Sequence, residues 1–75
     1  MKEKILIMLR EVQPYEDILE STELIKSGLL SSLEIFSLIT EIEFTFDITL
    51  KDEDVILENF ASAGAIEKML SKYEV

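Results

Sequence analysis

The sequence predicts an all-α fold, a small four-helix bundle of three longer helices and one short helix. A long loop joins the first and second helices. Three observations support this prediction. Apolar residues recur at helical spacing in three separate segments. Serines stand where two of the helices should begin. The chain has 75 residues, 48% of them hydrophobic, which suits one packed domain over residues 1–75 and no more.

The first helix is predicted over residues 2–12, because four apolar residues share one face there: Ile5, Met8, Leu9 and Val12. Pro14 closes this helix, since the residue before a proline disfavours helical geometry. Residues 13–31 then form the long connection. A loop of this length in a small domain is usually functional or is pinned by its own side chains.

The second helix is predicted over residues 32–46. Ser31 is a suitable N-cap, since its hydroxyl can accept a hydrogen bond from a free backbone N–H. Glu34 falls in the first turn, where its charge is favourable toward the helix dipole. Residues 47–50 favour extended structure and end the helix.

The rest of the chain is predicted to form a short and a longer helix. The short helical turn covers residues 52–58 and is broken at 59–61. Ser62 caps a last helix over residues 63–72. Its buried face is expected to hold Ile66, Met69, Leu70 and Tyr73.

The second helix has two apolar stripes. The first is the expected core stripe: Ile35, Leu38, Ile39, Ile42 and Phe46. The second lies on the opposite side: Leu33, Phe36, Thr40 and Phe44. Polar and acidic residues border it, with Glu34, Ser37 and Glu41 on one edge and Glu43 and Asp47 on the other. A domain this small cannot cover both stripes. The second stripe is therefore expected to be exposed and to form a binding surface for partner proteins. Alternatively, Leu33 and Phe36 lie under the long loop, but Phe44 is harder to cover.

Composition excludes several kinds of chemistry. The chain has no cysteine and no histidine, so disulfides, thiolate metal sites and the usual zinc ligands and general base are absent. The net charge of −9 disfavours nucleic acid and anionic membranes as partners and favours basic protein surfaces. No apolar run is long enough to span a bilayer. We therefore expect a cytoplasmic monomer without membrane insertion.

The segment Gly28-Leu29-Leu30-Ser31-Ser32-Leu33-Glu34-Ile35 resembles the attachment site of acyl, peptidyl and D-alanyl carrier proteins. That family shows a loop, then Asp-Ser-Leu, then an acidic helix. The similarity continues through Phe46-Asp47-Ile48-Thr49-Leu50 and Glu58-Asn59-Phe60-Ala61-Ser62, and it covers nearly the whole chain. The three-residue motif is weak alone, but it is fairly specific in combination with the other segments.

The resemblance implies a free-standing carrier protein, which is not an enzyme and has no catalytic or metal-binding residues. Ser32 would carry 4′-phosphopantetheine. A separate Mg²⁺-dependent phosphopantetheinyl transferase would transfer this group from coenzyme A, and the Ser32 hydroxyl would attack the β-phosphorus of the pyrophosphate. Acyl or aminoacyl groups would then travel as thioesters in fatty acid, polyketide or nonribosomal peptide biosynthesis. The loading and accepting enzymes would dock on the second helix, at Leu33, Glu34, Phe36, Ser37, Thr40, Glu41 and Phe44.

Two positions depart from the family pattern. Ser31 stands where most carrier proteins have aspartate, so the carboxylate expected to meet a basic residue of the transferase is missing. Losing such a contact costs on the order of 1–3 kcal/mol, which would slow or prevent modification. Phe44 stands where the family often has a charged residue.

Other functions remain open. A carrier-like adaptor that is never phosphopantetheinylated would use the same acidic helix in protein–protein interaction. A hydrolase built on the serine pair would need Lys26 or a carboxylate as its base, and nothing in the sequence places one suitably. The acids between residues 47 and 54 do not match an EF-hand, so at most weak cation binding is expected there. The cargo, whether fatty acyl, polyketide, amino acid or D-alanine, is not determined.

Overall fold

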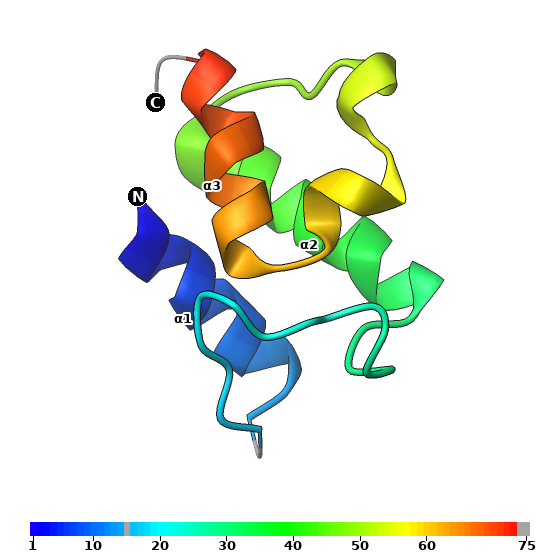
Figure 1. The fold of residues 1–75 in the computed structure, drawn as a ribbon. Coiled ribbons are helices and arrows are strands. Elements are labelled where there is room, and N and C mark those ends of the chain that lie inside the picture. Colours follow the sequence, from blue (N-terminus) through cyan, green and yellow to red (C-terminus); the bar gives the residue numbers. More distant parts are fainter. Residues whose placement is uncertain (15, 74–75) are drawn as a thin grey trace.

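The computed structural model describes residues 1–14 and 16–73. That part forms three α-helices: α1 (Lys2–Val12), α2 (Ser32–Phe46) and α3 (Ala63–Leu70). Three short 3-10 helices accompany them: η1 (Asp52–Asp54), η2 (Leu57–Phe60) and η3 (Ser71–Tyr73). The described part of the chain contains no strand. Helix α1 packs against both α2 and α3, and the long connection crosses the lower end of the molecule in Figure 1. The prediction of an all-α fold is confirmed.

The helices assemble because most of each predicted apolar face is buried, although Val12 and Tyr73 are only half-buried. Ile5, Met8 and Leu9 of α1 face the core, as do Ile66, Met69 and Leu70 of α3. From α2 the core receives Ile35, Leu38 and Ile42, while Ile39 and Phe46 are half-buried. Burial of one aliphatic side chain contributes about 1.5–3 kcal/mol, so these three faces supply most of the apolar driving force.

The long connection between α1 and α2 is held in place by its own residues. Ile18, Leu24 and Leu30 are buried. The Leu24 N–H donates to the carbonyl of Ala61 at 2.8 Å, and the Leu30 N–H donates to the carbonyl of Leu24 at 3.0 Å. Gly28 adopts φ +80°, a left-handed conformation that other residues resist. The connection therefore delivers a fixed backbone to the start of α2.

The fourth helix of the predicted bundle is not formed as one helix. The segment predicted as a short helix over residues 52–58 consists instead of η1 and the start of η2. Val55 and Ile56 interrupt them, and Ile56 is extended, with φ −127° and ψ 153°. β-branched side chains favour such geometry over a helix. The last predicted helix is also shorter, because its end tightens into η3 after Leu70.

Candidate functional site

The start of α2 is fixed by a reciprocal pair of hydrogen bonds. Ser31 is the N-cap, and its hydroxyl accepts a bond from the Glu34 backbone N–H at 3.3 Å. In return, Glu34 Oε1 accepts a bond from the Ser31 backbone N–H at 2.8 Å. This arrangement is a capping box, in which the two residues satisfy two otherwise free N–H groups. The predicted capping role of Ser31 is confirmed.

Glu34 accepts a second hydrogen bond, from Gln13, the C-cap residue of α1. Its Oε2 accepts a bond from Gln13 Nε2 at 2.9 Å, and the same Gln13 amide donates to the carbonyl of Leu29 at 2.7 Å. The hydrogen bond from the Ser31 backbone N–H is the main reason that the pKa of Glu34 lies below its ordinary value. Glu34 is half-buried and hydrogen-bonded within the chain, whereas the sequence predicted it as an acid of the first turn and a partner-facing residue.

The Ser-x-x-Glu spacing is itself a sequence signal for a capping box and could have indicated this role of Glu34. Gln13 was missed, and no local signal could have found it, because its partners lie 16 and 21 residues further along the chain.

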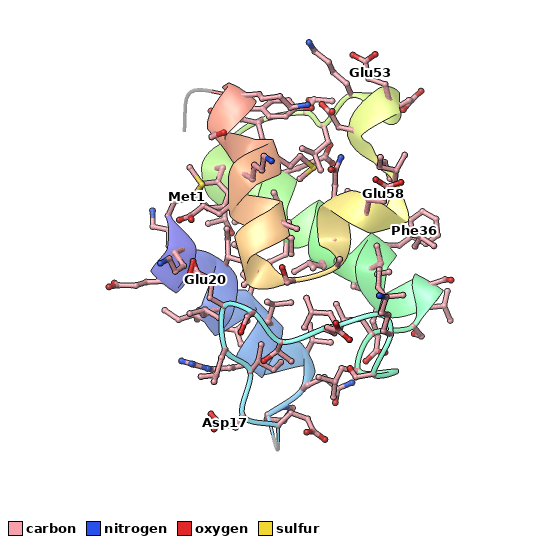
Figure 2. All side chains as sticks on the ribbon, viewed as in Figure 1. Met1, Asp17, Glu20, Phe36, Glu53 and Glu58 are labelled. Atoms are coloured by element: carbon pink, nitrogen blue, oxygen red, sulfur yellow. The ribbon has the colours of Figure 1, made fainter. Side chains whose placement is uncertain are left out.

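Ser32 is the first residue of α2 and is exposed. It lies at the edge of a groove of about 460 Å³ between α2 and the 55–60 segment. The groove is mostly apolar, and its lining residues are Ser32, Ile35, Phe36, Ile39, Val55, Ile56, Leu57, Glu58 and Phe60. Figure 2 shows Phe36 and Glu58 near each other on this side of the molecule. The serine predicted as the attachment residue thus borders an apolar depression.

The second stripe of α2 is exposed, as predicted. Leu33 is 79% exposed, Phe36 64% and Phe44 88%. Thr40 is also exposed, and its hydroxyl donates to the carbonyl of Phe36 at 3.2 Å. The alternative in which the long loop covers Leu33 and Phe36 is wrong.

The predicted partner-facing residues of α2 lie at different distances from Ser32. Only Phe36 among them lines the groove. Ser37 and Glu41 are exposed on the adjoining edge of α2. Phe44 lies twelve residues beyond Ser32, or about 18 Å along the helix axis at 1.5 Å per residue. On the other edge, Glu43 Oε2 accepts a hydrogen bond from the Leu50 N–H at 2.8 Å and so fixes the chain after α2.

A cluster around Asp54 supports the opposite wall of the groove. Asp54 is buried, and its Oδ1 accepts a hydrogen bond from Lys72 Nζ at 2.6 Å. Its Oδ2 accepts one from the Tyr73 hydroxyl, which in turn accepts a bond from the Lys51 N–H at 3.0 Å. Asn59 Nδ2 donates to the carbonyl of Asp54 at 2.7 Å. No pattern in the sequence predicts this cluster.

Charge pairing sets the ionisation of the cluster. The hydrogen bond from Lys72 is the main reason that the pKa of Asp54 lies below its ordinary value, and the same bond raises the pKa of Lys72. Burial, followed by the hydrogen bond to Asp54, raises the pKa of Tyr73. The carboxylate is thus stabilised in its charged form and ties the 51–55 segment to η3, which follows α3.

Two further features concern the described residues, 1–14 and 16–73. Within these ranges the structure brings together no three acidic side chains that could hold a metal ion. None of the helices described is long and apolar enough to cross a membrane.

Comparison with known proteins gives one informative likeness. The chain superposes with a TM-score of 0.81 on a carrier chain in the crystal structure of Bradyrhizobium japonicum glycine:[carrier protein] ligase complexed with glycylated carrier protein. The two sequences are 24% identical, and the match covers 91% of this chain and 95% of that chain. No protein-family model and no curated protein sequence matches the chain. The resemblance to carrier proteins is therefore confirmed at the level of the fold.

Proposed function

We propose that this chain is a carrier protein that bears acyl or aminoacyl groups as thioesters on a 4′-phosphopantetheine arm attached to Ser32. The observation that carries the proposal is the place of Ser32 in a carrier-like fold. Its hydroxyl is exposed at the first residue of α2 and borders the apolar groove.

The residues around Ser32 fit a phosphodiester-linked arm. The N-terminus of a helix favours negative charge, because its free N–H groups point outward and the helix dipole is positive there. The groove beside Ser32 offers apolar walls from Ile35, Ile39 and Val55 to an arm or its cargo. When bound, the arm supplies the thiol that this cysteine-free chain lacks. Ser32 would contribute the oxygen that forms the new bond to phosphorus, while the pyrophosphate bond of coenzyme A breaks and adenosine 3′,5′-bisphosphate leaves. The transferase would accept the proton of the serine hydroxyl.

The exposed stripe of α2 supports docking of partner enzymes. Leu33, Phe36 and Phe44 offer apolar contacts on a chain of net charge −9. A partner with an apolar depression bordered by basic residues would be complementary, and the charges would accelerate its encounter. The partners are thus a phosphopantetheinyl transferase and the enzymes that load and accept the cargo. Because the matched chain is described as glycylated, small amino acids are the first cargo to test.

The proposal is tested by mass spectrometry of the intact protein after incubation with coenzyme A, Mg²⁺ and a broad-specificity transferase. The wild-type protein should gain the mass of one phosphopantetheine group, and Ser32→Ala should gain nothing. Ser31→Gly is the matched control, because glycine replaces an N-cap serine at a cost of only a few tenths of a kcal/mol. It should still gain the mass of one phosphopantetheine group, because the Ser32 hydroxyl is retained. If neither a broad-specificity transferase nor a cognate transferase changes the mass of the wild-type protein, the proposal is contradicted.

The second candidate is the adaptor that is never modified. It rests on Ser31, the one position where the expected carboxylate is absent. It predicts that Ser32→Ala leaves the cellular role of the protein intact, whereas the carrier predicts loss of that role.

A further inference from the structure

Gln13 links three parts of the chain around Ser32. It is the C-cap of α1, where its backbone N–H donates to the carbonyl of Leu9 at 3.0 Å. A glutamine amide has two N–H donors on one nitrogen. Here that nitrogen bonds to the carbonyl of Leu29 at 2.7 Å and to Glu34 Oε2 at 2.9 Å. The end of α1 is thereby joined to the loop before α2 and to the first turn of α2.

These bonds enclose the backbone of Ser32. Leu29 lies three residues before Ser32, and Glu34 lies two residues after it. Glu34 Oε1 closes the ring by accepting the Ser31 N–H at 2.8 Å. The ring thus fixes the chain on both sides of Ser32 and leaves the Ser32 side chain exposed.

We propose that Gln13 and Glu34 are positioning residues for the modification of Ser32. They hold the backbone on both sides of the serine so that its hydroxyl is presented in one orientation at the start of α2. The inference rests on the proposed function, and it deepens it by assigning a task to two residues that do not react.

The same bonds bear on the absence of an aspartate at position 31. The Ser31 hydroxyl keeps the capping bond, and the Glu34 carboxylate is held at the same helix terminus by Ser31 and Gln13. A transferase residue of positive charge would therefore still meet a carboxylate in the first turn of α2. A glutamate side chain without these two hydrogen bonds would rotate freely, and its carboxylate would not stay at the start of α2.

The test compares four variants in steady-state kinetics with the transferase and coenzyme A. Gln13→Ala should lower kcat/KM roughly 10- to 100-fold through kcat, as expected when a reacting group loses its orientation. Glu34→Ala should lower kcat to a similar extent and should also raise KM, because it removes the carboxylate as well. Glu34→Gln can keep the capping bond from the Ser31 N–H but not the bond from Gln13, because a glutamine side chain has one acceptor oxygen where glutamate has two. Its kcat should therefore fall like that of Gln13→Ala, and its KM should rise because the charge is lost. Glu11→Ala, an exposed neighbour on α1, is the control and should match the wild type.

Two measurements separate positioning from general loss of structure. Amide hydrogen exchange at residues 31–34 should accelerate in Gln13→Ala, while exchange in the core of α3 stays unchanged. The Gln13→Ala/Glu34→Ala double variant should be little slower than either single variant, because both substitutions break the same ring. A kcat of Gln13→Ala equal to that of the wild type overturns the inference, as does strictly additive loss in the double variant. An unmodified wild-type protein would instead overturn the proposed function.

Discussion

At the scale of single residues, two adjacent serines have different structural roles. Ser31 has an extended backbone and directs its hydroxyl to the Glu34 N–H, whereas Ser32 is helical and exposed. A serine at position 31 preserves the cap that an aspartate would provide, but it brings no charge. The difference between serine and aspartate at position 31 is therefore electrostatic rather than conformational.

Restoring that charge gives the first prediction. Ser31→Asp should fold like the wild type, because aspartate is an equally good N-cap. Its carboxylate should strengthen the contact with a basic transferase residue and lower KM about tenfold, which corresponds to about 1.4 kcal/mol. Kinetics of phosphopantetheine transfer measure the effect, with Ser31→Asn as the uncharged control. An unchanged KM would show that the transferase does not read a charge at this position.

At the scale of the elements, α2 performs two tasks with its two faces. Ile42 is fully buried, while Phe44, two residues further on, is 88% exposed. The buried face holds the helix in the core, and the exposed face is free for a partner. Substitutions on the two faces should therefore affect different properties.

Ile42→Ala should lower the free energy of unfolding by about 2–5 kcal/mol, because it removes buried methyl groups and leaves a cavity. Phe44→Ala should change it by less than about 0.5 kcal/mol, as is usual for surface positions. Urea titrations of the two variants measure the difference. If Phe44 is part of the docking surface, Phe44→Ala should also weaken binding to a loading enzyme. Comparable destabilisation by both variants would contradict the assignment of the two faces.

The 51–55 segment depends on one buried carboxylate. The pKa of Asp54 in the folded chain lies below its ordinary value of 3.8, chiefly because Lys72 donates to it. A depressed pKa means that the carboxylate stabilises the fold above about that ordinary value, and that this contribution is lost as the pH falls through the folded-state pKa. The anchor of the groove wall should therefore weaken in acid.

Asp54→Asn should lower the urea midpoint at pH 7, and its midpoint should fall less than that of the wild type between pH 7 and about pH 3. Asp52→Asn is the control, because Asp52 is an exposed residue of the same 3-10 helix, η1. An equal acid dependence in Asp54→Asn and the wild type would show that Asp54 does not contribute to it.

At the scale of the whole molecule, the sequence predicted what depends on local pattern. The bounds of α1 and α2, the Ser31 cap and the exposed stripe all follow from periodicity and capping chemistry, and the structure confirms them. The prediction of one short helix over residues 52–58 was wrong, because it ignored the preference of Val55 and Ile56 for extended backbone. Asp54 with Lys72, and Gln13 with Glu34, could not be predicted, because each pair meets only after the chain has folded.

The molecule as a whole combines an acidic surface, an exposed serine and an apolar groove in a fold shared with a carrier chain. The central claim, that Ser32 carries phosphopantetheine, is tested most directly on protein purified from its native cells. Intact-mass analysis, followed by fragmentation of the peptide that holds residues 31 and 32, should show one phosphopantetheine group on Ser32, with or without cargo. Protein that is unmodified under all growth conditions, or modified on Ser31 instead, would contradict the claim.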